Sequence, residues 1–326
     1  MKPIGGFIEL EICAGAGNSY HGQATALWCA RACLSLIVKK LRPRRVFVPF
    51  YTCDSSLEPL IDNNIEFSFY NLDASLEIES PPALQTDDFI VYINYFGLKE
   101  SYVFDLLSQY GQQLIVDNTQ SFFSRSYEDA VCSFNSARKF FGVPDGGYLY
   151  APFEIEPEIP RNTEISCTHL INRVLGKQEQ SYREFLANES EFDSTVKGIS
   201  LLSERILNNL DYEAVAAKRR ENFSVYHEAF EKINRLRVDF TEYQVPFCYP
   251  LLLDEPLDKP ALYRQNIFVS TLWTDVLSRA IEEKDDFSFE RRFAENLSSL
   301  PIDQRYDSTD CERVIDAIKK LIERRG

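Results

Sequence analysis

The segment 88–94, Asp-Phe-Ile-Val-Tyr-Ile-Asn, restricts the fold of this chain more than any other part of it. It is apolar except at its two ends, which is typical of a strand that is covered on both faces. Predicted elements alternate around it: strands at 24–28, 45–49, 65–70 and 114–117, and helices at 31–40, 55–61 and 101–110. This alternation predicts an α/β fold with a mostly parallel sheet flanked by helices.

The second half of the chain has a different pattern. A long helical region runs from about 211 to 234, a strand is predicted at 267–273, and an amphipathic helix at 310–325 has basic residues in its last turn. A chain of 326 residues is also too long for one small core. We therefore expect a large domain over 1–210 and a smaller α+β domain over 211–326.

Composition excludes several partners. A net charge of −15 disfavours nucleic acid, because phosphate contacts need concentrated Lys and Arg. No apolar run approaches the ~20 residues that span a bilayer, and no charged-then-apolar leader opens the chain. The eight cysteines form no CxxC pair, and the three histidines are isolated, so we expect no metal site. A cytoplasmic protein with reduced thiols and no membrane partner is the resulting expectation.

The chemistry of the chain is predicted to centre on Lys139. The strand at 114–117 ends in an acid, Asp117, and in parallel sheets ligands bind beyond the carboxyl ends of the strands. Gln120 follows this strand, and Ser136 lies just before the lysine. Pyridoxal 5′-phosphate (PLP) needs an anion at its pyridine nitrogen, an amine for its aldehyde and small polar groups for its phosphate. The pattern therefore suggests a PLP site.

The neighbours of Lys139 add support for a reactive amine, although an ordinary surface lysine stays open on the residues alone. Phe140 and Phe141 would help to desolvate the amine, which favours the neutral nucleophile that Schiff-base formation requires. A phosphate also needs backbone amides, which the N-terminus of a helix supplies. Ala30 and Arg31 stand at such a strand-to-helix junction, although a plain β-α turn fits these residues equally well. Asp117, Gln120 and Ser136 likewise have ordinary readings as cap, loop and turn residues.

In their order along the chain these motifs resemble those of PLP-dependent aminotransferases of fold type I, most closely the DegT-type sugar aminotransferases. The resemblance covers the first 150 residues well and is loose beyond them. The matching segments are the following: a phosphate loop at 29–34, a Pro-containing segment at 48–53, a stretch at 93–97, the Asp-x-x-Gln signature at 117–120 and the lysine region at 136–147.

The resemblance implies an aspartate-aminotransferase-like large domain and a role for each site residue. Lys139 would carry PLP as a Schiff base and move a proton between substrate and cofactor. Asp117 would bind the ring nitrogen, and Gln120 the phenolic oxygen. The phosphate would be held by a further set of residues: Ser136, Ala30 and Arg31.

The chain departs from the family at several positions. Cys29 and Ala30 stand where Ser and Gly are usual, and Asn94 replaces a frequent His. Cys53 occupies the position of the aromatic residue that stacks on the cofactor ring. Tyr51 is the candidate to replace that aromatic, and Asn94 is retained as a candidate cofactor contact.

The function implied by the resemblance is transfer of an amino group from glutamate to a nucleotide-linked keto-sugar or a related keto metabolite, by a homodimer whose site borrows residues from the neighbouring subunit. Two alternatives stay open. One is another PLP reaction such as sugar dehydration, although such dehydrases generally have His in place of the lysine. The other is a non-catalytic binding protein with this fold. Four residues are candidate anion or sugar binders: Arg138, Arg173, Tyr182 and Arg219.

Overall fold

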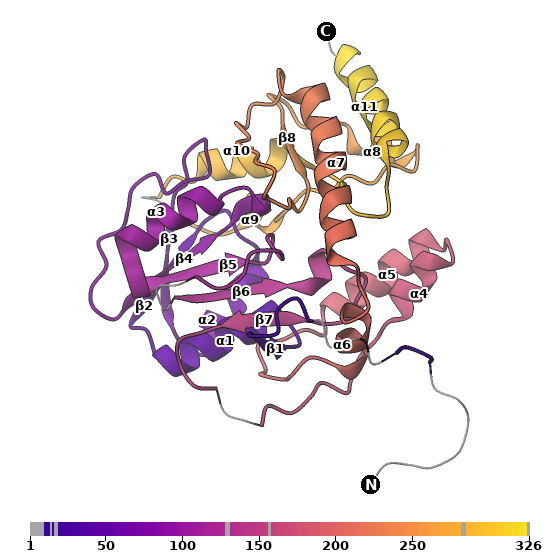
Figure 1. Ribbon diagram of the computed structural model, residues 1–326. Helices are drawn as coiled ribbons and strands as arrows, with labels where there is room; N and C mark the ends of the chain where they lie inside the picture. The colour runs from indigo at the N-terminus through magenta and orange to yellow at the C-terminus, as the bar shows by residue number, and fades with distance from the viewer. Residues whose placement is uncertain are drawn as a thin grey trace.

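A computed structural model describes residues 10–13, 15, 19–127, 131–155, 158–281 and 285–324 (Figure 1). Its main feature is a seven-stranded sheet in the order β1-β7-β6-β5-β4-β2-β3. The pairs from β3 to β6 are parallel, whereas β7 is antiparallel to both of its neighbours. The predicted α/β fold is therefore confirmed. The strands are β1 (Thr25–Leu27), β2 (Arg45–Pro49), β3 (Glu66–Tyr70), β4 (Asp88–Ile93), β5 (Leu114–Asn118), β6 (Cys132–Ser136) and β7 (Gly147–Tyr150).

Helices cover both faces of this sheet because the central strands are apolar on both sides. Val91 and Ile115 face a core that includes the buried side of α1 (Ala30–Leu41). Tyr92 and Val116, one residue further along each strand, face a second core that includes α3 (Glu100–Tyr110). The remaining helices before residue 210 are α2 (Glu58–Asp62), α4 (Thr168–Val174), α5 (Gln178–Glu189) and α6 (Leu201–Leu207). Four single 3-10 turns accompany them: η1 (Asp54–Ser56), η2 (Tyr95–Gly97), η3 (Gly111–Gln113) and η4 (Ala137–Lys139).

The rest of the chain forms a second, two-stranded antiparallel sheet with helices around it. The sheet pairs β8 (Tyr249–Leu252) with β9 (Leu297–Leu300). Figure 1 shows the long α7 running from the main sheet up to this region, beside α11. The helices are α7 (Tyr212–Phe230), α8 (Lys259–Tyr263), α9 (Asp275–Ser278), α10 (Ser288–Asn296) and α11 (Ser308–Glu323). In the described part of the chain, no helix is long and apolar enough to cross a membrane.

The strand predicted at 267–273 is wrong. That segment makes only an isolated bridge, between Ser270 and Ser299. Left-handed backbone at Asn266 (φ 57°), just before the segment, and at Trp273 (φ 55°), its last residue, limits the extended stretch to the residues between them. The predicted division at residue 210 stays a prediction, because one apolar core runs from Tyr51 and Tyr95 into Phe293 without a break.

Candidate functional site

A cavity lies at the carboxyl ends of β4, β5 and β6, where the fold class places ligands. Ile93 of β4 pairs with Asp117 of β5, and Asp117 pairs with Phe134 of β6, so the three strands end at the same level. Lys139 follows β6 in the short turn η4. Of the eight cofactor contacts predicted from the sequence, five line this cavity: Asp117, Lys139, Ser136, Ala30 and Arg31.

Asp117 is the buried acid of the cavity. Its side chain is held by Thr119, whose backbone N–H donates to Oδ1 over 2.8 Å. Burial raises the pKa of Asp117, and the positive charge of Lys139 and the hydrogen bonds from Thr119 offset that rise only in part. The carboxylate would therefore gain from a protonated nitrogen placed against it.

Lys139 supplies an amine to the same cavity. Its Nζ donates to the hydroxyl of Thr119 over 3.5 Å, a long hydrogen bond that leaves the amine capacity for other partners. Phe140 and Phe141 do not line the cavity, contrary to their predicted role of desolvating the amine. They pack instead against Phe122, at ring distances of 5.9 and 4.8 Å, and so anchor the turn that carries Lys139.

The other end of the cavity is built to attract an anion. Helix α1 starts there at Ala30, and its N-cap Cys29 accepts the N–H of Ala32 through its thiol at 3.4 Å. The first backbone amides of the helix carry partial positive charge. Ser136 presents a hydroxyl to the same cavity. β7 can pass beneath this helix start only because residue 147 is glycine: a Cβ there would lie 2.7 Å from the carbonyl atoms of Cys29.

Two arginines add full charges at this end. Arg31 forms an ion pair with Glu58 at 3.0 Å. Arg138 forms an ion pair with Glu189 and lies 3.9 Å over the ring of Phe192. Burial lowers the pKa of Arg138 to about 10, which still leaves the guanidinium protonated at neutral pH. Of the four candidate anion binders from the sequence, only Arg138 lines this cavity.

Three predicted cofactor contacts lie outside the cavity lining. Gln120 is fully buried, its Oε1 accepts the N–H of Phe96 at 2.7 Å, and its Nε2 has no partner among the described residues. Asn94 donates to Glu100 at 2.6 Å and also bonds the next strand. Tyr51 is fully buried, with its ring 4.6 Å from that of Trp273. These side chains support the floor and wall of the cavity rather than face it.

Several lining residues were not predicted from the sequence. Thr119 had a local signal, since it lies inside the Asp-x-x-Gln segment. Trp273 and Glu189 had none, because they come from distant parts of the chain. Cys53 was noted as a departure from the family pattern, and it lines the cavity with its thiol against the Ser55 and Ser56 hydroxyls at 3.1 and 3.0 Å.

One arginine from the C-terminal region holds the wall that contains Cys53. Arg279, just after α9, donates to the carbonyl of Thr52 at 2.7 Å and to Asp54 at 2.6 Å. Its side chain is only 7% exposed. Asp275 of α9 accepts the backbone N–H of Asp54 at 3.0 Å. The loop 50–56 is thus attached to the same C-terminal segment that supplies Trp273.

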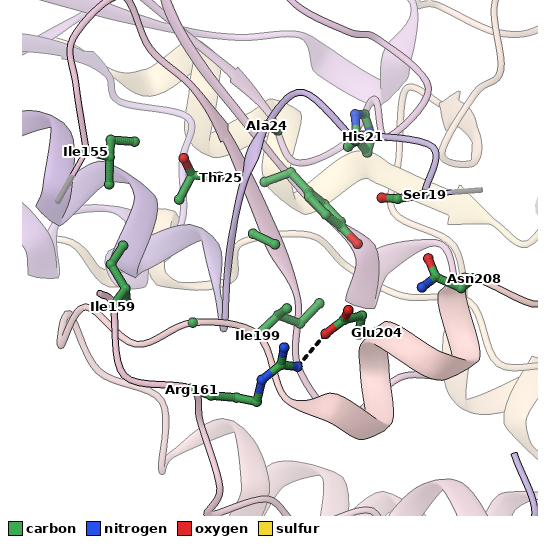
Figure 2. Close-up of a pocket in the computed structure, with 14 residues that line it drawn as sticks. Ser19, His21, Ala24, Thr25, Ile155, Ile159, Arg161, Ile199, Glu204 and Asn208 are labelled. Atoms are coloured by element: carbon green, nitrogen blue, oxygen red, sulfur yellow. Dashed lines mark hydrogen bonds and ion pairs between the residues drawn. The ribbon is translucent and has the colours of Figure 1, made fainter. Parts of the chain in front are cut away.

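A larger cavity, about 510 Å³, lies beside β1 and holds none of the predicted site residues (Figure 2). Figure 2 shows Arg161 and Glu204 paired across it, with Ile155, Ile159 and Ile199 nearby. Its histidine, His21, bonds the Tyr150 hydroxyl at 2.7 Å and the Phe122 carbonyl at 2.8 Å. Burial lowers the pKa of His21 to about 4, so the ring is neutral and both nitrogens are engaged. Within the described ranges no group of three or more His, Cys, Asp or Glu residues is placed to hold a metal.

Comparisons with known proteins identify the fold. No protein-family model matches the chain, and no curated protein matches it significantly. Among similar solved structures is the aminotransferase TlmJ from Streptoalloteichus hindustanus, with 17% sequence identity, a TM-score of 0.65, and a match over 94% of this chain and 89% of that one. Spr1654 from Streptococcus pneumoniae, provisionally named a sugar aminotransferase and solved in its PLP form, has 14% identity and a TM-score of 0.66 over 94% of this chain and 89% of its own. A DegT DnrJ EryC1 StrS aminotransferase from Brucella abortus has 15% identity and a TM-score of 0.60 over 94% of this chain and 91% of its own. At these identities the likeness establishes the fold that this chain shares with them.

Proposed function

We propose that this chain is a PLP-dependent aminotransferase that passes an amino group from an amino donor to a keto-sugar or a related keto metabolite. One observation carries the proposal: a buried acid, Asp117, and an amine, Lys139, lie in one cavity whose other end is the N-terminus of α1. The names of the similar structures support the proposal. All three are named aminotransferases; the name of Spr1654 also mentions sugar and PLP, and the name of the Brucella abortus protein mentions DegT.

The residues of the cavity fit PLP by their chemistry. The buried Asp117 carboxylate suits a protonated ring nitrogen, and the Lys139 amine suits the aldehyde. The α1 amides, the Ser136 hydroxyl and the guanidiniums of Arg31 and Arg138 suit a phosphate. Gln120 lies outside the cavity lining, and its buried Nε2, which has no partner in the described part of the chain, keeps a donor available.

Each residue then has a defined task. When bound, PLP supplies a conjugated ring that withdraws electrons from the substrate carbon. Asp117 keeps its negative charge against the ring nitrogen, and the Thr119 N–H orients that carboxylate. Lys139 holds and moves a proton at Nζ, with the Thr119 hydroxyl as its positioning partner. Trp273 forms part of the cavity wall, and Arg279 keeps the adjacent loop 50–56 in place.

The finer features belong to the same proposal. Glutamate is the proposed donor, and a nucleotide-linked keto-sugar the proposed acceptor, in a cytoplasmic protein with a large domain over 1–210 and a small one over 211–326. A homodimer is supported by the apolar surface of α4 and α5, where Ile171, Val174 and Leu175 are 54%, 87% and 62% exposed. Sedimentation analysis of the purified protein tests the dimer; a monomer at micromolar concentration would contradict it.

Absorbance of the purified protein mixed with PLP tests the central proposal. We expect a band near the visible edge that borohydride reduction removes and that Lys139→Ala lacks. A wild-type protein without this band would refute the function. Addition of glutamate should then bleach the band if the protein is a glutamate-dependent aminotransferase. A stable band that neither glutamate nor other amino acids change would favour the non-catalytic binding protein instead.

A further inference from the structure

The anion end of the cavity is covered by one short segment, 189–193, which begins at the last residue of α5. Glu189, the last residue of α5, is paired with Arg138. The carbonyl of Phe192 accepts from the Arg31 guanidinium, and its ring lies beneath Arg138. The carbonyl of Asp193 accepts from the thiol of the α1 N-cap at 3.6 Å. The segment thus contacts both guanidiniums and the start of α1.

Glu189 is the member of this segment that places a negative charge in the cavity. A carboxylate at the C-terminal end of a helix is disfavoured by the helix dipole, so α5 itself does not stabilise it. Its ion pair with Arg138 compensates for that position. A phosphate that approached Arg138 would bring about two negative charges next to this carboxylate, and like charges in a partly buried site repel strongly.

The side chain of Glu189 lies at the surface end of its helix and has room to leave Arg138. α5 packs mainly against α4, and this pair leaves Tyr182 and Leu186 57% and 50% exposed. Ser190, directly after Glu189, is exposed. Its neighbours Asn188 and Phe192 are buried, whereas the Glu189 side chain is itself 32% exposed. The carboxylate can therefore turn toward solvent by side-chain rotation, without movement of the helix.

We propose that Glu189 is a built-in competitor for the phosphate of the cofactor. Its carboxylate neutralises Arg138 in the cofactor-free protein and leaves Arg138 when a phosphate binds there. Glu189 thereby sets how tightly the anion end holds a phosphate. This inference rests on the proposed function, since it assigns the anion end to a cofactor phosphate.

The test compares binding of three probes, inorganic phosphate, PLP and pyridoxal, to the full-length wild type and to Glu189→Gln by calorimetry. Glu189→Gln removes the competing charge, so its dissociation constants for inorganic phosphate and for PLP should be about tenfold lower than those of the wild type. A tenfold change corresponds to about one charge-assisted hydrogen bond. Pyridoxal, which lacks the phosphate, should bind equally to both proteins. Glu179→Gln is the matched control: it makes the same change of net charge at the exposed start of α5, and it should bind all three probes like the wild type.

Opposite results would overturn the inference. If Glu189→Gln binds phosphate as the wild type does or more weakly, Glu189 is a structural partner of Arg138 rather than a competitor. An equal gain for pyridoxal would show that the effect does not arise at the phosphate. Should Glu189→Gln fold poorly, Glu189→Asp replaces it; the shorter carboxylate should reach Arg138 less well and give a smaller gain of the same sign. Phosphate binding does not depend on Lys139, so a missing absorbance band would refute the proposed function without deciding this inference.

Discussion

The amine of Lys139 and the hydroxyl of Thr119 are joined by a hydrogen bond of 3.5 Å, while the backbone N–H of Thr119 holds the carboxylate of Asp117 at 2.8 Å. One residue thus positions both of the groups on which the proposed chemistry depends. Thr119 can do so because it lies two residues beyond the acid, at the turn where β5 ends. This arrangement makes Thr119 a positioning residue, and its two contacts can be separated by mutation.

Thr119→Val removes the hydroxyl and leaves the backbone N–H that holds Asp117. We expect the protein to fold normally, and the formation of the PLP band at Lys139 to slow about tenfold because the amine loses its positioning partner. Stopped-flow absorbance measures this rate. Thr119→Ser keeps a hydroxyl and should therefore form the PLP band at nearly the wild-type rate. Equal slowing in both variants would show that the hydroxyl does not position Lys139.

Asp117→Asn should change how the cofactor-free protein responds to pH. Burial raises the pKa of Asp117 in the folded state, so the wild type loses stability as pH rises through that pKa, when the buried group becomes charged. Asparagine does not ionise, so the variant should lack this loss and be more stable near neutral pH by about 1 kcal/mol.

Urea unfolding of both proteins between pH 4 and pH 8, without PLP, measures the difference. The same variant with PLP should lose nearly all aminotransferase activity, because a neutral amide cannot keep the ring nitrogen protonated. A variant that is less stable at neutral pH and equally active would contradict both expectations for Asp117.

Gly147→Ala should destabilise the protein by roughly 2–4 kcal/mol, because the added Cβ would lie 2.7 Å from the backbone carbonyl of Cys29. The strain falls on the first turn of α1, so phosphate binding should weaken as well. Gly142→Ala is the matched control, since a Cβ at residue 142 meets nothing within 4 Å. Thermal unfolding of the two variants should differ clearly, and equal melting temperatures would refute the close contact.

Arg279→Ala should release the loop 50–56 from α9. The buried guanidinium bonds the carbonyls of Phe50 and Thr52 and the carboxylate of Asp54. Its loss leaves the Thr52 carbonyl without this partner and removes a buried charge-assisted contact, so the free energy of unfolding should fall by about 2 kcal/mol. Arg235→Ala is the control, because Arg235 forms an ion pair with Asp254 in which both side chains are more than 60% exposed, and such pairs contribute at most about 1 kcal/mol. Chemical denaturation measures the free energy of unfolding of both variants. Similar decreases for the two would show that Arg279 does not hold the loop 50–56 in place.

The fold was predictable because its signals are local. Each predicted strand and helix before residue 120 overlaps an observed element, with bounds that differ by at most three residues. The apolar run of β4 and the caps and turns around it act over short distances. The strand predicted at 267–273 was wrong for the opposite reason. Its residues favour an extended chain, but left-handed backbone at Asn266 and Trp273 limits its length, and within it only Ser270 bridges to another strand, at Ser299. Nothing in the local pattern indicates either feature.

The cavity was predictable in part. Asp117, Ser136 and Lys139 could be found because parallel strands bring their carboxyl ends together. Gln120 carried an equally good signal, yet its side chain turns to the N–H of Phe96, outside the cavity lining. The direction of a side chain beyond a strand end depends on which backbone groups need partners nearby, and distant segments supply those groups.

The sequence by itself determines the alternation of strands and helices, the parallel sheet, and the acid, serine and lysine at the ends of β5 and β6. Only the tertiary structure decides what encloses them. Trp273 forms one wall and Glu189 occupies the anion end, although each is more than 45 residues from Lys139 in the chain. Short-range periodicity specifies an element, whereas the enclosure of a cavity depends on packing between elements that no local pattern encodes.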